Sequence, residues 1–114
     1  MNKSYRLKME QLLREHKLTK ELIINCIAKS DKKVSNLAYK EKQYRHVGHN
    51  NFKLELDNLI QYRQPFFDVL KDGYNMTLTE IKNEIAIADE NKIPTKKVID
   101  QIREMIEAWD YTLV

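Results

Sequence analysis

The sequence contains little cysteine, glycine and proline, and it has no long uncharged hydrophobic run. Its single cysteine, Cys26, excludes an internal disulfide framework and suits a reducing compartment, where it would serve as a small buried apolar side chain. Two glycines and two prolines in 114 residues leave few helix breakers. Strand-like alternation is nearly absent, whereas apolar residues recur at helical spacing. We therefore expect an all-α protein.

Several functional classes find no support in the sequence. No nucleophile and base pair, glycine-rich phosphate loop or cluster of metal ligands can be assembled, so we expect neither catalysis nor a cofactor. His46 and His49 form an H-x-x-H pattern, but Gly48 between them disfavours a helix and we expect no metal there. The first residues carry charges every few positions, which predicts neither a signal peptide nor a membrane span. We expect a cytoplasmic protein.

Charge is distributed unevenly along the chain. Residues 1–50 carry 12 Lys/Arg and 5 Asp/Glu, a net charge of +7, whereas residues 51–114 carry 8 and 12, a net charge of −4. A basic half is the electrostatic footprint expected for a nucleic-acid partner, and an acidic half would repel phosphate. The alternative is that both halves simply have ordinary solvated faces.

The stretch from Leu18 to Glu41 predicts two short helices joined by a tight turn. Ser30 stands where the N-cap of a second helix, beginning at Asp31, would lie. The apolar residues that would face the core in the two helices are Leu22, Ile23, Ile27, Val34, Leu37 and Ala38.

This stretch resembles the helix-turn-helix of the phage-repressor (Cro/C1, Xre-like) family. The matching residues, in register, are Leu18-Thr19-Lys20-Glu21, Ile23, Ile27, Ser30 and Val34-Ser35-Asn36-Leu37. Ile24, Ala28 and Lys29 depart from the family's small Ala, turn Gly and apolar residue. The resemblance implies a DNA-binding head over about half the chain. A purely structural helical hairpin is the alternative.

The resemblance also implies which side chains contact DNA. Five polar residues of the second helix are expected to contact bases: Asp31, Lys32, Ser35, Asn36 and Lys40. Four more are expected to hold phosphates: Lys20, Lys42, Tyr44 and Arg45. Asn36 could pair with adenine and Asp31 could accept a hydrogen bond from cytosine.

The remaining segments predict further helices. A helix from Ser4 to about Lys17 and one from Phe52 to about Gln61 would complete a head over residues 1–62. Pro65 predicts the start of another helix, and residues 63–114 would form a helical module. Thr77 and Glu80 form a capping-box pattern. Residues 77–109 superficially resemble a second helix-turn-helix, but their long loop and negative charge argue against DNA binding.

The final helix has the strongest apolar stripe, Val98, Ile102, Met105, Ile106 and Trp109. Packing within the chain is the simpler interpretation for most of these residues. A lone head offers few base contacts, however, so a homodimer reading two half-sites is expected. Its interface, or that with another partner, is predicted at Phe66, Phe67, Ile106 and Trp109.

These patterns predict a sequence-specific DNA-binding regulator of phage or mobile-element type. Double-stranded DNA would be its partner, and the chain would be dimeric and without membrane contact. The alternative is a phage-encoded inhibitor, such as an anti-CRISPR or host-takeover protein, whose acidic C-terminal half binds a host protein.

Overall fold

Five α-helices and one 3₁₀ turn make up the part of the chain that the structure describes. The computed structural model describes residues 3–45 and 51–113, with the side chains of 6–45 and 51–109. The elements are α1 (Lys3–Glu15), α2 (Lys20–Gln43), α3 (Phe52–Asp72), α4 (Leu78–Ala86), η1 (Glu90–Lys92) and α5 (Lys96–Leu113). No strand occurs over these ranges, so the predicted all-α class is confirmed.

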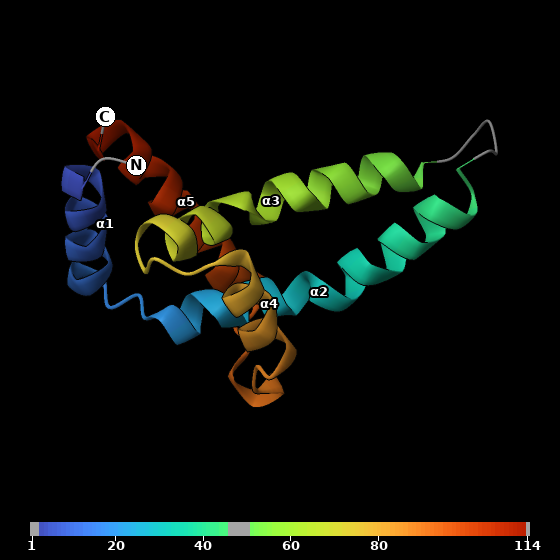
Figure 1. Cartoon of the computed structure of the whole chain (residues 1–114), viewed down its shortest axis with the longest axis horizontal. Coiled ribbons are helices and arrows are strands. Elements are labelled where there is room, and N and C mark those ends of the chain that lie inside the picture. The colour runs from blue at the N-terminus through green and yellow to red at the C-terminus, as the bar shows by residue number, and fades with distance from the viewer. Residues whose placement is uncertain (1–2, 46–50, 114) are drawn as a thin grey trace.

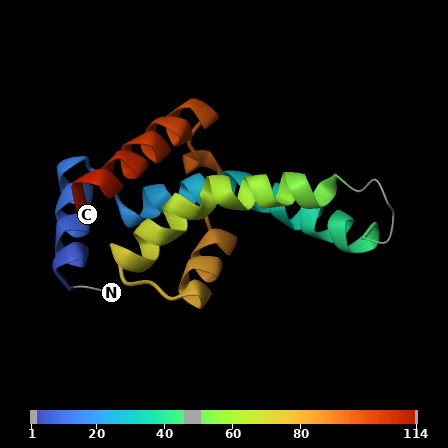
Figure 2. The ribbon, with the colours of Figure 1, turned by 90° about the horizontal axis from the view of Figure 1, so that it is seen from above.

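The two longest helices, α2 and α3, run antiparallel and project together from the rest of the molecule (Figures 1 and 2). We call residues 31–45 and 51–62 the arm. The other described residues form the body, in which α1, α4 and α5 surround the remaining parts of α2 and α3 (Figure 2). The arm gives the molecule its elongated shape, 47 × 33 × 27 Å.

Alternating spacings of four and three residues explain why α2 and α3 stay together along their length. This heptad spacing keeps one stripe of each helix facing its partner. The α2 stripe is Ile23, Ile27, Ser30, Val34, Leu37, Glu41 and Tyr44, and the α3 stripe is Phe52, Leu56, Leu59, Arg63, Phe66 and Leu70. The Tyr44–Phe52 ring contact, 5.7 Å between centroids, and the Asp31–Arg63 ion pair, 3.7 Å, set the register.

Most seam residues are more buried in the body than in the arm, where Leu37 is an exception. Ile23 and Ile27 are fully buried, whereas Val34 and Leu56 are only partly buried and Tyr44 is exposed. Each side chain of a two-helix hairpin has few neighbours, because no third helix covers it. The arm is therefore held by a narrower core than the body.

The body has one hydrophobic core to which every α-helix contributes. Its buried members are Met9, Leu13, Leu18, Ile23, Ile24, Cys26, Ile27, Phe66, Val69, Leu70, Met76, Ile81, Ile85, Ile99, Ile102, Ile106 and Trp109. Gly73 allows α1 to approach α3 closely, because a Cβ there would lie 2.8 Å from Leu13 Cδ1 and 2.7 Å from the Val69 carbonyl oxygen. Cys26 is buried in this core, as predicted, and its burial raises the pKa of its thiol to about 12.

Polar contacts fix α5 to α3 where the arm meets the body. The Tyr62 hydroxyl donates to Asp100, and Arg103 Nε donates to the Tyr62 carbonyl oxygen at 3.0 Å. The Arg103 guanidinium also lies over the Tyr62 ring, 4.7 Å from its centroid. At the far end of α5, Trp109 contacts the ring of His16, which is exposed near the end of α1.

The predicted turn of the helix-turn-helix is wrong, because α2 continues without interruption through Ser30. The Ser30 hydroxyl donates to the Ile27 carbonyl oxygen at 3.2 Å, inside the helix, and does not cap a second helix. Residues 28–31, Ala-Lys-Ser-Asp, contain no glycine or proline to stop the first helix. The predicted pair of short helices is thus one helix of 24 residues.

The predicted break at Pro65 is also wrong, because α3 passes through this residue. Proline removes one backbone hydrogen bond and bends a helix without having to end it. Figure 2 shows such a bend along α3. The predicted boundary between residues 62 and 63 therefore lies inside α3, and one core cluster contains residues from both sides of it.

Local sequence signals in the C-terminal half agree better with the structure. The capping box is confirmed, with Glu80 N donating to Thr77 Oγ1 at 3.2 Å and Thr77 N donating to Glu80 Oε1 at 3.2 Å. The predicted final helix is confirmed as α5. Of its stripe, Ile102, Ile106 and Trp109 are buried, whereas Val98 is exposed.

Candidate nucleic-acid interface

The side of α2 that points away from α3 carries cations and neutral polar groups. We call it the outward face, and it consists of Lys32, Ser35, Asn36, Tyr39, Lys42 and Gln43. All six are exposed, and Tyr39 is 68% exposed. They share one side because they recur at helical spacing opposite Leu37, which is buried against α3.

Both carboxylates of the arm's α2 segment are paired with arginines away from the outward face. Asp31 pairs with Arg63 of α3, and Glu41 accepts two hydrogen bonds from Arg45, at 3.0 and 3.2 Å. The hydrogen bond and charge of Arg45 hold the pKa of Glu41 below its usual range, so this carboxylate stays ionised at neutral pH. Within the described side chains, Lys32 and Lys42 have no ion-pair partner. They are therefore available to an anionic ligand.

The predicted base-contacting residues separate into two groups. Lys32, Ser35 and Asn36 lie together on the outward face. Asp31 and Lys40 turn toward α3, because Asp31 pairs with Arg63 and Lys40 lies over the Phe52 ring, 5.6 Å from its centroid. The expectation of five side chains on one reading surface is wrong for these two.

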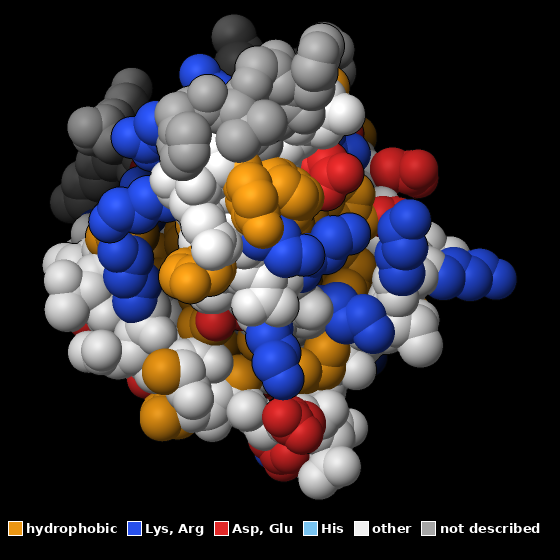
Figure 3. All heavy atoms as spheres, turned by 90° about the vertical axis from the view of Figure 1, so that its right-hand side faces the viewer, with side chains coloured by type: hydrophobic (Ala, Val, Ile, Leu, Met, Phe, Trp, Pro, Cys, Tyr) orange, Lys and Arg blue, Asp and Glu red, His pale blue; other side chains and the backbone are white. Residues whose placement is uncertain are grey.

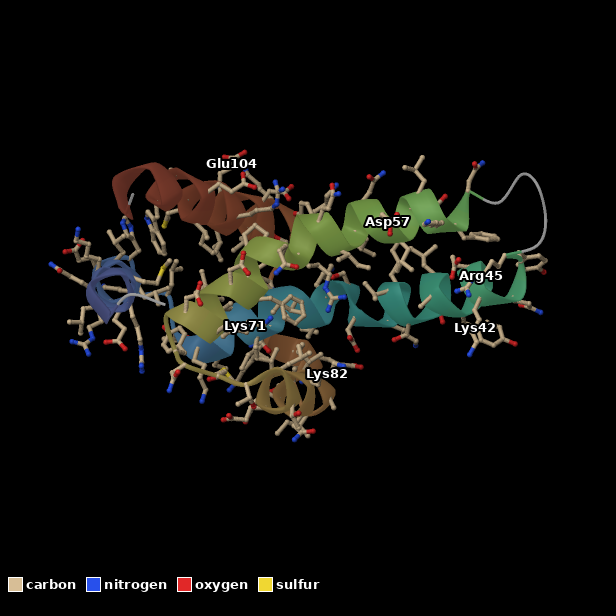
Figure 4. The ribbon with its side chains drawn as sticks, turned by 45° about the horizontal axis from the view of Figure 1, so that its top comes forward. Lys42, Arg45, Asp57, Lys71, Lys82 and Glu104 are labelled. Atoms are coloured by element: carbon tan, nitrogen blue, oxygen red, sulfur yellow. The ribbon has the colours of Figure 1, made fainter. Side chains whose placement is uncertain are left out.

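The predicted phosphate-contacting residues are likewise not all brought together. Lys42 and Arg45 lie at the tip of the arm (Figure 4), beside Tyr44. Lys20 is the first residue of α2 and lies in the body. At about 1.5 Å per residue, a continuous helix places it about 33 Å from Lys42. The turn that would have shortened this separation is absent from α2.

Viewed toward the tip of the arm, the molecule presents a mixed surface of basic, acidic and apolar groups (Figure 3). Figure 3 shows lysine and arginine side chains spread over this end of the molecule, interspersed with apolar groups, and acidic side chains mainly toward the edges. His46 and His49, for which no metal was expected, lie outside the described residues.

The predicted dimer or partner interface is wrong, because its residues belong to the core. Phe66, Ile106 and Trp109 are only 1%, 3% and 5% exposed. Phe67 is partly buried beneath Arg63, whose guanidinium lies 5.3 Å from the ring centroid. An apolar stripe identifies the buried side of a helix but not what packs against it. Here the other helices of the same chain pack against it.

Sequence reasoning missed two buried polar residues, Arg63 and Asn25. Arg63 occupies a seam position of α3, where its Nε has no hydrogen-bond partner and burial lowers the pKa of its guanidinium. Its position in the heptad spacing could have revealed it. Asn25 lies between Ile24 and Cys26 in α2, and both of these neighbours are buried. The amphipathic pattern alone would place Asn25 at the edge of the core and not inside it.

The described residues offer neither a membrane-spanning helix nor a metal cluster as a further candidate site. No helix of the described chain has the length and apolar character needed to cross a membrane. Residues with described side chains contain no cluster of three potential metal ligands. Comparison with protein-family models, with curated proteins and with solved structures finds no match. Any function must therefore be argued from the geometry of this chain.

Proposed function

We propose that the arm binds duplex DNA through the outward face of α2, in a cytoplasmic regulator of phage or mobile-element type. The observation that carries the proposal is a helical face with unpaired Lys32 and Lys42, four neutral side chains that can hydrogen bond and no carboxylate. Lysines would neutralise phosphates, and Asn36 could hydrogen bond a base edge.

The shape of the arm supports this mode of binding. The outward face extends from residue 32 to residue 43, about 17 Å along the helix axis. The major groove of B-DNA is about 12 Å wide and admits an α-helix. Because the arm projects from the body, its helix could enter a groove while the body stays outside it (Figure 1). This mode uses a straight helix and needs no helix-turn-helix.

The proposal is tested by fluorescence anisotropy with the full chain and a labelled duplex of about 30 base pairs over a range of salt concentrations. Binding should weaken as salt rises, because bound lysines release counterions. The double variant Lys32→Gln, Lys42→Gln should reduce the slope of log K against log salt by about two, because each of the two lysines would neutralise one phosphate.

A charge-matched control lies in the body. Lys71 of α3 and Lys82 of α4 are exposed and lie away from the arm (Figure 4). Lys71→Gln, Lys82→Gln removes the same net charge and should leave the salt slope close to that of the wild type. Equal reductions of affinity in the two double variants, or affinity independent of salt, would contradict the proposal.

A second candidate function is inhibition of a host protein through the C-terminal half. The observation that favours it is the acidic balance of residues 51–114, which matches a partner with a basic binding groove. The full chain should then be captured by a basic host protein even when Lys32 and Lys42 are replaced. Loss of capture in that double variant would assign binding to the arm instead.

A further inference from the structure

We infer that a pocket beside the start of α2 receives the cationic side chain, lysine or arginine, of a protein partner. The pocket has a volume of about 280 Å³ and lies where α2 meets the end of α4. We call it the amide pocket, and its lining residues are Lys20, Glu21, Ile24, Asn25, Glu84, Ile87, Ala88 and Asp89. The proposal does not depend on DNA binding by the arm.

An unpartnered amide lines this pocket. Asn25 is only 4% exposed, and no other described residue hydrogen bonds its side chain. Its polar atoms are not among those fully enclosed by the protein, so a group that enters the pocket can reach them. Its carbonyl oxygen can accept a hydrogen bond from an ammonium or guanidinium group that enters the pocket.

The charges around the amide favour a cation. Glu84 is partly buried and has no ion-pair partner among the described residues. Asp89 accepts from Asn91 N at 2.9 Å through one oxygen, which leaves its second oxygen available. Glu21 is already bonded to Lys92 at 3.1 Å. The three carboxylates Glu21, Glu84 and Asp89 outnumber the two lysines, Lys20 and Lys92, so the net charge around the pocket is negative.

The apolar part of the lining fits the aliphatic stem of a long cationic side chain. Ile24 and Ala88 line the pocket, and Ile87 beside them is 76% exposed. Lysine and arginine bury their methylene groups against such a surface while their charged ends reach polar groups. The volume lies just below the range of about 300–1,000 Å³ typical of small-molecule sites, which suits a single side chain.

NMR titration of the full chain tests the inference with three small probes: N-acetyl-arginine amide, N-acetyl-lysine amide and N-acetyl-norleucine amide. Norleucine has an aliphatic stem without the charge. The two cationic probes should shift the side-chain NH₂ signal of Asn25 and the backbone signals of Glu84 and Asp89, and norleucine should not. Binding in the millimolar range is expected for one side chain.

Two variants and a matched control localise the effect. Asn25→Leu and Glu84→Gln should each weaken binding of the cationic probes about tenfold, because the first removes a hydrogen-bond acceptor and the second removes the negative charge that strengthens such a bond. Glu104→Gln, on the exposed side of α5 and far from α4 (Figure 4), removes an equal charge and should retain wild-type affinity.

The possible results separate clearly. Equal shifts with norleucine, wild-type affinity in Glu84→Gln, or an equally weakened Glu104→Gln would overturn the inference. Should Asn25→Leu fail to fold, Glu84→Gln still decides, because the Glu84 side chain makes no described hydrogen bond or ion pair whose removal would unfold the chain. DNA binding by the arm should be unchanged in Glu84→Gln, so the two proposals fail separately.

Discussion

Arg63 is a charged side chain placed where the seam of the hairpin would accommodate an apolar one. It is buried, its Nε is unpaired, and its partner Asp31 is half exposed. The ion pair therefore compensates only part of the cost of burying the guanidinium. Packing of the aliphatic stem and the contact with the Phe67 ring supply the remainder.

Two substitutions at this position should have opposite effects. Arg63→Met keeps a long apolar side chain and removes the buried charge, so we expect the free energy of unfolding to rise by about 1 kcal/mol. Arg63→Ala leaves a cavity and should lower it by about 2 kcal/mol or more. Chemical denaturation measures both. A decrease in stability in Arg63→Met would show that the ion pair outweighs the cost of burial.

The residues of the candidate interface were only partly predictable. Helical spacing places Lys32, Ser35 and Asn36 on one exposed side, whichever helix they belong to. Asp31 and Lys40 flank that side, and their orientation depends on Arg63 and Phe52 of α3. These contacts depend on how α2 and α3 are aligned along each other. The sequence of α2 alone does not determine that alignment.

At the scale of the element, signals within one helical turn were reliable and helix boundaries were not. Thr77 and Glu80 satisfy each other locally, so their pattern correctly predicts the start of α4. Ser30 also fits an N-cap, but the helix continues through it. Packing of α2 against α3 stabilises this longer helix. Pro65 is tolerated inside α3 because neighbouring residues on both sides pack into the core.

The capping box should make the stability of the chain depend on pH in the acidic range. Hydrogen bonds from Thr77 hold the pKa of Glu80 below its usual value. A lowered folded-state pKa gives a contribution that is present above the unfolded value, near 4.5, and is lost as pH falls through the folded value. Thermal denaturation of the wild type and of Glu80→Gln should therefore diverge above about pH 4.5 and converge in stronger acid. A constant difference between the two would contradict this role.

At the scale of the whole molecule, the core shared by α1 to α5 leaves less apolar surface for a partner than the sequence suggests. Since Phe66, Ile106 and Trp109 are buried, a homodimer that reads two half-sites would need other apolar groups. Leu54 and Ile60, both on the α3 side of the arm, are 63% and 43% exposed. They are among the exposed apolar side chains that such a dimer could bury.

Two glutamate substitutions distinguish core from surface. Trp109→Glu should unfold the chain or lower its stability by more than about 3 kcal/mol, because it removes a buried indole and buries a charge. Ile60→Glu should keep the wild-type helix content by circular dichroism, and it should convert any dimer detected by light scattering to a monomer. A folded, monomeric Trp109→Glu variant would instead favour an interface on α5.

The weakening of the α2–α3 seam toward its tip has a dynamic consequence. Backbone amides exchange with solvent by local opening, and segments with few buried contacts open at the lowest free energy. Amide protection in α2 should therefore be higher at Ile27, in the body, than at Glu41, near the tip, as hydrogen-exchange mass spectrometry or NMR can measure. The arm would then fray from its free end while its root stays closed. The outward face of α2 lies on this arm. It can therefore bend to follow a curved ligand without disturbing the core of the body.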